Sequence, residues 1–495
     1  MKKNILIMLA FLLLQVLSAN AQSWQTVGSA SFSAGSVDYT SIAIDGNGTP
    51  YVVYADGGNS NKATVMKYYG GSWVTVGSAG FSTGAAQYTT IAIDGNGTPF
   101  VAFKNVGNSN RATVMTYSSG SWTTVGTAFS AGDALYTSIA INSTGTPYVA
   151  YCDGGNGYKA CVKKYLSGSW VTVGTDGFSV GEAEYMSLAL NSSGTPYVVF
   201  RDGGNALWKA TAMTLSSGSW TTLGSRGFSP TYADYENIAI DGDGTPYVVF
   251  QDFTAYKATV MKFISGSWVT VGSANFTPDY AYSPSIAIDG SGTPYVVFQD
   301  GANAYKASVM KYYGGSWVNV GSAGFSAGNA QATTIAINSS GTPYVVYKDV
   351  ENSYKATVMK LGSTVPTVTT ASISNITSSG ATSGGDVTSD GGASITARGI
   401  CWNTSGNPTT SNNIATVSGT TGTFTANLIN LTSSTTYYVR AFATNSVGTS
   451  YGSQVSFTTS AGSVAATPTL STWALIILTI SAAGFGGWFV MKRFV

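Results

Sequence analysis

Seven tryptophans at nearly constant spacing divide most of the chain into repeats of 48 to 50 residues. A repeat of about 40 to 50 residues matches one blade of a β-propeller, whereas the rungs of a β-helix are far shorter. The seven repeats begin at Trp24, Trp73, Trp122, Trp170, Trp220, Trp268 and Trp317.

Each repeat contains four short strand-like phrases. In the second repeat these are Ser72 to Gly77, Thr90 to Ile93, Pro99 to Phe103 and Ala112 to Met115. The phrases alternate or are rich in β-branched residues, and Gly, Asn, Asp or Ser bounds them. Four strands per repeat of about 49 residues predict an all-β fold with a seven-bladed β-propeller over residues 22–362.

The order of strands within a blade follows from side-chain size. The phrase Ile-Ala-Ile, Asp-x-x-Gly, Thr-Pro-Tyr-Val-Val resembles the first hairpin of blades in other propeller families, which makes it the inner pair and the tryptophan strand the outermost. Alanine near the axis and tryptophan at the rim fill a wedge. The strand from Ser23 to Gly28 has no blade of its own, and the last repeat ends at Leu361 without a tryptophan strand. These two ends are predicted to pair and close the ring.

The composition excludes several classes of function. Only 9% of residues are charged, against about 25% in ordinary soluble domains, and the net charge is +1. Without a basic stripe, no nucleic-acid partner is expected. The chain has no histidine, which excludes Ser-His-Asp and Cys-His catalysis and histidine metal sites. Turns such as Asp45 to Gly48 lack a downstream acidic calcium ligand and are interpreted as hairpin turns. We therefore expect no catalytic residue, metal or cofactor.

The two ends of the chain carry export signals. Residues 1–21 have a basic start, an apolar stretch and an Ala-Asn-Ala site, which is typical of a signal peptide and predicts a mature chain from Gln22. Near the other end, Trp473 to Val490 is an apolar helix candidate of 18 residues followed by Lys492 and Arg493. The sequence thus predicts an exported protein at the cell envelope or outside the cell, with its C-terminal segment inserted in the membrane at least transiently.

A linker is expected at 461–470 and a sorting segment at 467–495. The run Thr-Pro-Thr-Leu-Ser-Thr-Trp at 467–473 resembles the start of bacterial IPTL-type (exosortase) sorting domains, although Thr467 replaces the usual Ile or Val. The resemblance implies a sorting protease as partner. A permanent membrane anchor is the alternative.

Residues 363–460 form a Ser/Thr-rich segment without the repeat, of a length that suits a β-sandwich. Leu431 and the run from Thr435 to Asn445 resemble the closing strands of fibronectin type III domains, with Tyr437 in the tyrosine-corner position. The resemblance implies a spacer or a binding module.

The cysteines leave two interpretations open. Cys152 and Cys161 are expected to face each other across one hairpin, so they form either a disulfide or two buried thiols. Cys401 lies in the second domain and is expected to be a buried hydrophobe.

The loop between the second and third strands of each blade concentrates the scarce charge. It begins with an acid, ends with a cation, and in several blades has an aromatic residue just before the cation. Either these residues cap and pair within the turn, or they form a ring of ligand contacts. The candidate binding residues are Asp153, Tyr158, Lys159, Asp202, Trp208, Lys209, Asp252, Tyr256, Lys257, Asp300, Tyr305, Lys306, Asp349, Tyr354 and Lys355.

Near-identical loops favour repeated weak binding over one tailored pocket. We therefore predict a non-enzymatic surface or secreted adhesion protein that binds glycan or protein partners through the propeller loops. One alternative is a secreted, carboxylate-dependent enzyme resembling glycoside hydrolases, for which two acids must flank a bond. Another is a purely architectural envelope protein. The loop acids available to an enzyme are Asp38, Asp133, Glu182, Glu184 and Asp234.

Overall fold

A computed structural model describes residues 22–204 and 208–462, and within these ranges the regular structure is β-strand with four short 3-10 turns and no α-helix. The chain divides into two compact units, one reaching to Thr364 and including Gly391–Ser394, the other formed by Val365–Asp390 and the residues from Ile395 onward. The predicted domain limits stay predictions.

Several predictions concern residues outside the described ranges. They are the signal peptide at 1–21, the sorting or membrane segment at 467–495 with its apolar helix, and all but the start of the linker at 461–470. Among the residues that are described, no helix has the length and apolar character needed to span a membrane.

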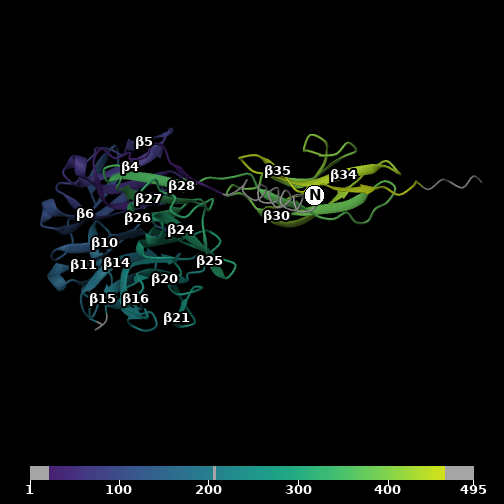
Figure 1. The fold of residues 1–495 in the computed structure, drawn as a ribbon. Coiled ribbons are helices and arrows are strands. Elements are labelled where there is room, and N and C mark those ends of the chain that lie inside the picture. The colour runs from purple at the N-terminus through teal and green to yellow at the C-terminus, as the bar shows by residue number, and fades with distance from the viewer. Residues whose placement is uncertain (1–21, 205–207, 463–495) are drawn as a thin grey trace, which may run out of the picture. The chain divides into compact units, whose positions relative to one another are not determined.

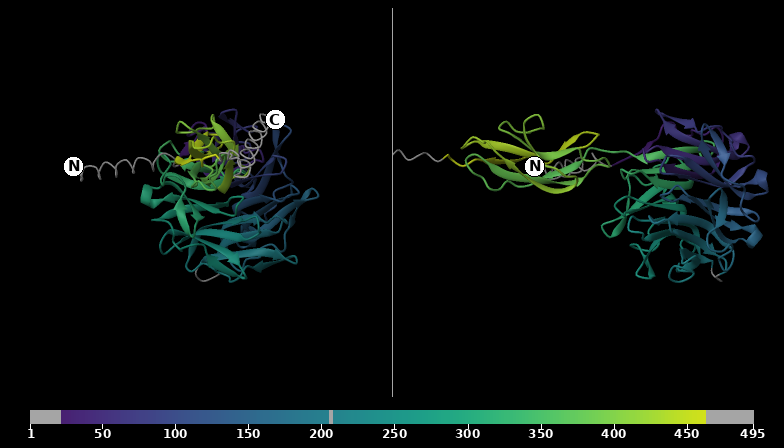
Figure 2. Two further views of the ribbon diagram at one scale, coloured as in Figure 1. Left: turned by 90° about the vertical axis from the view of Figure 1, so that its right-hand side faces the viewer. Right: turned by 180° about the vertical axis from the view of Figure 1, so that it is seen from behind.

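The first unit is a seven-bladed β-propeller, as predicted, with its sheets arranged around a common centre (Figures 1 and 2). Blade 1 is an antiparallel sheet of β2 (Val37–Ile44), β3 (Pro50–Asp56), β4 (Lys62–Tyr69) and β5 (Ser72–Thr75), from the inner to the outer strand. Short 3-10 turns follow the second strand of four blades: η1 (Gly57–Asn59), η2 (Val106–Asn108), η3 (Gly154–Asn156) and η4 (Gly301–Asn303).

The next five blades repeat this order. Blade 2 contains β6 (Ala86–Ile93), β7 (Pro99–Asn105), β8 (Arg111–Ser118) and β9 (Ser121–Thr124); blade 3 contains β10 (Ala134–Ile141), β11 (Pro147–Asp153), β12 (Lys159–Leu166) and β13 (Ser169–Thr172). Blade 4 contains β14 (Ala183–Leu190), β15 (Pro196–Asp202), β16 (Lys209–Ser216) and β17 (Ser219–Thr222); blade 5 contains β18 (Ala233–Ile240), β19 (Pro246–Asp252), β20 (Lys257–Ile264) and β21 (Ser267–Thr270). Blade 6 contains β22 (Ala281–Ile288), β23 (Pro294–Asp300), β24 (Lys306–Tyr313) and β25 (Ser316–Asn319).

Blade 7 is made from both ends of the unit. It joins β26 (Ala330–Ile337), β27 (Pro343–Asp349) and β28 (Lys355–Leu361) to the N-terminal strand β1 (Trp24–Thr26). The register pairs Trp24 with Leu361 and Thr26 with Met359. The predicted closure by the N-terminal strand is therefore confirmed, and no free edge is left at the join.

The second strand of each blade reads as a nearly continuous apolar run because both of its faces are covered. In β3, all seven residues of Pro-Tyr-Val-Val-Tyr-Ala-Asp are buried. Neighbouring blades supply the cover, since Val53 packs in one core with Val101 and Phe103 of blade 2. A sheet packed on both sides loses the polar–apolar alternation of a sheet that faces water.

The second unit is a two-layer β-sandwich (Figure 1). One sheet contains β29 (Thr367–Thr370), β30 (Ala381–Ser389) and β33 (Gly422–Leu428); the other contains β32 (Asn413–Thr416), β31 (Ala397–Asn403), β34 (Thr436–Thr444) and β35 (Thr449–Tyr451), with β36 (Val455–Thr458) also on β34. Tyr437 Oη accepts a 3.0 Å hydrogen bond from the backbone N–H of Thr432, the geometry of a tyrosine corner. Membership in the fibronectin type III family stays a prediction.

The disulfide interpretation of Cys152 and Cys161 is wrong, because both are free thiols. The register pairs Cys161 with Tyr151 and Cys152 with Ala160, so the two cysteines are not opposite each other. Cys152 packs in the core toward blade 4, whereas Cys161 packs in the core toward blade 2. The side chains therefore point to opposite faces of blade 3.

Candidate functional site

Every inner strand of the propeller carries a β-bulge near its start. In β2 the register with β3 shifts between Asp38 and Ser41, and Tyr39 inside the bulge has φ of 52°. A residue other than glycine in this left-handed region costs about 1–2 kcal/mol. Because all seven blades accept this cost, the bulge is a specific feature of the fold. The bulge residues, all with positive φ, are Tyr39, Tyr88, Tyr136, Tyr185, Tyr235, Ser283 and Ala332.

Five of these bulge residues are tyrosines whose rings form a continuous arc over blades 1 to 5. Successive ring centroids are 4.9, 4.9, 5.1 and 5.0 Å apart from Tyr39 to Tyr235. Their planes are tilted by 44° to 51°, a favourable geometry for aromatic pairs. Burial raises the pKa of all five phenols, to about 12 in Tyr136, so they stay neutral and can donate hydrogen bonds. We call this group the tyrosine arc.

The tyrosine arc borders a cavity of about 410 Å³ at the axis, which we call the axial cavity. All seven inner strands contribute to its wall with the residues directly after the bulge, and six of them, those of blades 1 to 6, also contribute the bulge residue. Hydroxyl groups dominate the polar part of that wall, including those of Thr40, Ser41, Thr89 and Thr90. The cavity lies at the strand ends from which the loops between second and third strands extend, since Val37 pairs with Asp56.

Hydrogen bonds next to the tyrosine arc link neighbouring inner strands in a ring that is incomplete. The hydroxyl after the bulge donates to the bulge carbonyl of the preceding blade at four joins: Thr40 to Ala332, Thr89 to Tyr39, Thr137 to Tyr88 and Thr333 to Ser283. Blades 4, 5 and 6 carry Met186, Glu236 and Pro284 at this position instead. One side of the axial cavity therefore differs from the rest.

Glu236 is the unusual member of that altered side. Its side chain lines the axial cavity and is only 4% exposed. Neither carboxyl oxygen has a hydrogen-bond partner among the described residues. Burial raises the pKa of Glu236 well above its ordinary value, and the nearby charge of Asp234 adds to this shift. Such burial favours the protonated form of the carboxyl, which can donate a hydrogen bond.

Arg201 on β15 joins the tyrosine arc to the loops. Its guanidinium forms ion pairs with Glu184 and Asp234. It also lies over the rings of Tyr185, Trp208 and Tyr232, at 5.0, 5.2 and 5.0 Å from the three centroids. The ion pairs and ring contacts hold the guanidinium from several sides, so Arg201 connects blades 4 and 5.

A second run of aromatic rings begins next to Arg201 and extends across blades 5 and 6. Successive centroids are 4.6, 5.2, 5.4, 6.2 and 6.1 Å apart. Phe253, Tyr280 and Tyr305 in this run are each more than 40% exposed. We call it the aromatic track, and its members are Tyr232, Phe253, Tyr256, Tyr280, Tyr282 and Tyr305.

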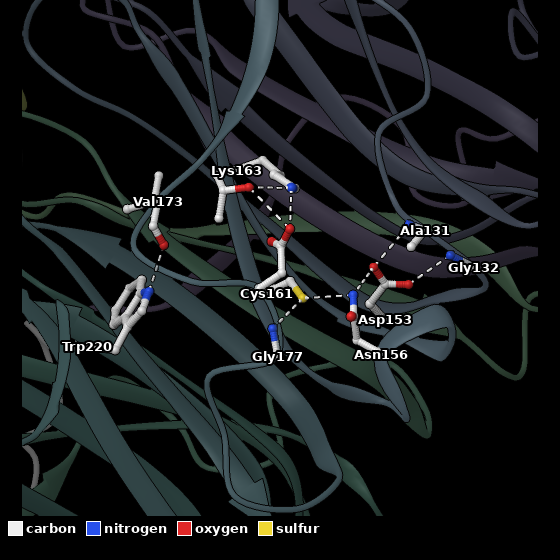
Figure 3. Close-up of polar contacts among 11 residues, drawn as sticks. Ala131, Gly132, Asp153, Asn156, Cys161, Lys163, Val173, Gly177 and Trp220 are labelled. Atoms are coloured by element: carbon white, nitrogen blue, oxygen red, sulfur yellow. Dashed lines mark hydrogen bonds and ion pairs between the residues drawn. The ribbon is translucent and has the colours of Figure 1, made fainter. Parts of the chain in front are cut away.

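The predicted loop aspartates are buried and hold their turns together. Asp153 is 1% exposed, and its carboxylate accepts hydrogen bonds from the backbone of Ala131 and Gly132 and from Asn156 Nδ2 (Figure 3). It also accepts one from the backbone N–H of Gly155. Four other aspartates cap their turns likewise, at Asp202, Asp252, Asp300 and Asp349. These carboxylates accept hydrogen bonds inside the protein, although Asp349 Oδ1 has no partner among the described residues.

The predicted aromatic residues lie in three different places. Tyr256 and Tyr305 belong to the aromatic track, and Trp208 lies beneath Arg201. Tyr354 lies under Lys348 of its own blade, and Tyr158 is partly exposed without a ring partner among the described residues. Lys159, Lys209, Lys257, Lys306 and Lys355 begin the third strands and pair in register with the buried aspartates. Ligand contact by these loops stays a prediction.

Four of the predicted loop acids are ion-paired, three of them across a blade join and Glu184 within blade 4. Asp38 pairs with Lys348, Asp133 with Lys104, and both Glu184 and Asp234 with Arg201. The cations occupy equivalent positions on the second strands, directly before the loop acid or amide. Glu182 makes no ion pair among the described residues. Four of the five acids are therefore bound to cations of the propeller itself.

Sequence reasoning did not identify the tyrosine arc or Glu236. A signal was present, since a tyrosine stands four residues before the inner alanine in five repeats, as Tyr39 does before Ala43. The pattern indicates a strand, and only the bulge turns this residue toward the axis.

No protein-family model and no curated protein matches the chain. Similar solved structures include an ulvan lyase, a polysaccharide lyase, with 13% identity and a TM-score of 0.47 over 68% of this chain and 96% of that one. Another is an α-L-arabinanase of Penicillium chrysogenum, with 13% identity and a TM-score of 0.40 over 61% and 98% of the chains. A third is the Aleuria aurantia lectin, with 16% identity and a TM-score of 0.40 over 60% and 97%.

These comparisons contradict the prediction that the chain is not an enzyme. That prediction rested on missing histidine and unmatched motifs, whereas the similar structures include polysaccharide lyases and an arabinanase as well as a lectin. At such identities the likeness is one of fold, and a propeller fold is compatible with both catalysis and binding. The exclusion of catalysis is therefore withdrawn.

Proposed function

We propose that the propeller is directed at carbohydrate and binds an oligosaccharide over the axial mouth. The observation that carries this proposal is the pair of aromatic runs beside a polar cavity, the tyrosine arc and the aromatic track, which Arg201 bridges. Aromatic faces pack against the apolar faces of sugar rings, while nearby hydroxyls exchange hydrogen bonds with sugar hydroxyls.

The cations on the second strands favour an uncharged saccharide. Lys104, Arg201 and Lys348 each have a carboxylate partner, and Arg201 has two. An anionic polysaccharide would compete with these internal acids for the same cations, and it would meet the charge of the second carboxylate on Arg201. Neutral sugars meet no such cost.

Cleavage of the bound glycan is a second candidate function, and the pair of acids on β18 favours it. Glu236 carries a proton in the cavity wall, which suits a general acid, while Asp234 is held by Arg201 at the same end of the strand. Two carboxyl groups in different environments are the arrangement by which glycosidic bonds are hydrolysed. In that reaction Glu236 would protonate the leaving oxygen, and Asp234 would activate water or attack the anomeric carbon.

The predicted export and sorting segments would put this propeller at the cell surface. Polysaccharides of the surroundings or of the envelope itself are then the accessible ligands. A surface protein of this kind would serve adhesion when it only binds, and glycan breakdown when it also cleaves.

The test uses the purified protein with soluble arabinan, mannan, xylan, mixed-linkage β-glucan and pullulan. Affinity electrophoresis measures binding, and the release of reducing ends measures cleavage. We expect at least one polysaccharide to bind, and Tyr136→Ala to weaken binding about tenfold through lost stacking. Tyr313→Ala is the matched control. Tyr313 is 67% exposed and is the last residue of β24, at the opposite end of the strand from Lys306 and the loops around the mouth. Equal losses in the two variants, or no binding at all, would overturn the proposal.

A further inference from the structure

The wall of the axial cavity is asymmetric in a way that the repeat does not require. At four blade joins a threonine hydroxyl donates to the bulge carbonyl of the neighbouring blade. At the three consecutive joins of blades 4, 5 and 6 the threonine is replaced by Met186, Glu236 and Pro284, so this position supplies no hydroxyl to the carbonyls of Tyr136, Tyr185 and Tyr235. The change lies on the side where the tyrosine arc meets the aromatic track through Arg201.

Glu236 stands at the middle of this altered side. It is buried, lines the cavity and has no hydrogen-bond partner for either carboxyl oxygen among the described residues. A buried carboxyl without a partner costs free energy that threonine, present in four other blades, would avoid. Such a group is explained when a ligand oxygen completes its hydrogen bond.

We infer that the axial cavity is a subsite for the terminal sugar residue of a glycan, with Glu236 donating a hydrogen bond to a ring or hydroxyl oxygen of that residue. This inference rests on the proposed function and specifies the mode of binding. The cavity volume of about 410 Å³ lies in the range of small-molecule sites, about 300–1,000 Å³.

The shape of the wall favours a chain terminus over an internal residue. All seven inner strands encircle the cavity, so a chain that runs across the face passes above it. A terminus or a one-residue branch can enter such a cavity along the axis, between the seven inner strands. The following residues of the chain then lie on the aromatic track, which leads away from the cavity at Tyr232 over blades 5 and 6.

The experiment compares intact and partially acid-hydrolysed samples of the polysaccharide that binds best among arabinan, mannan, xylan, β-glucan and pullulan. Isothermal titration measures the moles of protein bound per gram of sugar. End-on binding predicts that this capacity rises in proportion to the number of chain ends. Glu236→Gln keeps the size and a donor, so it is expected to retain the dependence on chain ends.

Glu236→Thr restores the hydroxyl that four other blades carry, so the fold accommodates it. We expect this variant to bind short chains about tenfold more weakly, while it retains binding of intact chains through the aromatic track. A wild-type capacity that is independent of chain length, or an unchanged preference for ends in Glu236→Thr, would overturn the subsite and leave the proposed function standing. Failure of the wild-type protein to bind any of the five polysaccharides would overturn both.

Discussion

Trp24 Nε1 donates a 2.8 Å hydrogen bond to the carbonyl of Val320, 296 residues later in the chain. The same indole stacks on Phe325 with ring centroids 4.1 Å apart. Six other blade joins repeat both contacts, for example Trp122 with the Val76 carbonyl and with Phe81. The join at Trp24 is different because β1 closes the ring. No hairpin connects β1 to its neighbour β28, whereas in the other blades a hairpin connects the third and fourth strands.

Removal of the closing indole is expected to destabilise the propeller more than removal of an equivalent indole elsewhere. Trp24 is 9% exposed, and a buried Trp→Ala change costs about 3–5 kcal/mol. Trp24→Ala and Trp122→Ala are compared by urea unfolding. Trp122 is more exposed and lies in β9, which a short hairpin joins to β8, so its loss is expected to cost less. An equal or smaller loss for Trp24→Ala would show that closure by β1 does not limit stability.

Replacement of Arg201 is expected to destabilise the joins around blade 4. Arg201→Gln leaves Glu184 and Asp234 without their shared cation, and breaking a buried ion pair costs about 3–5 kcal/mol, less where water reaches the acids. The control is Lys348→Gln, because its partner Asp38 is 57% exposed and such pairs contribute about 1 kcal/mol or less. Chemical denaturation of both variants gives the comparison. Adding Glu184→Gln and Asp234→Asn to Arg201→Gln is expected to recover part of the loss, and no recovery would argue against repulsion between the acids.

The three cysteines are expected to be unreactive in the folded protein and all reactive after unfolding. Cys152 and Cys161 are fully buried, and burial raises the pKa of Cys161 to about 12, so almost no thiolate forms near neutral pH. Iodoacetamide labelling followed by mass spectrometry checks this. In urea without reductant, three labels are expected, whereas a disulfide between Cys152 and Cys161 would leave only Cys401 labelled.

The propeller could be predicted because each repeat contains the same residue types at positions where their physical role is clear. Trp24 and its six equivalents mark the rim, the alanines such as Ala43 mark the axis, and the unmatched ends predict the closure. The disulfide interpretation failed because register decides which residues face each other, and a shift of one residue moves a side chain to the opposite face of the sheet.

The candidate site was harder to predict because it depends on a local backbone irregularity. Charge drew attention to Asp153 and its equivalents, yet the same charge is what lets them cap buried turns. The tyrosine arc needs positive φ at residues such as Tyr39, and tyrosine gives no sign of that conformation. The burial of Glu236 is equally hidden, since it occupies a position that is threonine in most repeats.

The pH dependence of stability gives a direct test of the neutral state of Glu236. Its pKa is raised in the folded protein, mainly by burial; its own backbone amide and Arg201 oppose the shift, and Asp234 adds to it. In the unfolded chain the group titrates near 4.5. Below that pH both states hold the proton, and above it the unfolded chain releases the proton while the folded protein retains it. The free energy of unfolding is therefore expected to fall as pH rises from about 4.5 toward the raised value, by at most about 1.4 kcal/mol per pH unit for this group.

Urea unfolding midpoints of the wild type and of Glu236→Gln, measured from about pH 4.5 to 8, isolate this contribution. The amide keeps the size of the side chain and cannot ionise, so the downward slope is expected to become shallower in the variant. Asp234, whose pKa burial also raises, contributes a slope of the same sign in both proteins and cancels in the comparison. Parallel curves for the two proteins would mean that Glu236 releases its proton at an ordinary pH. The carboxyl would then be ionised in the axial cavity and could not donate the hydrogen bond assigned to it.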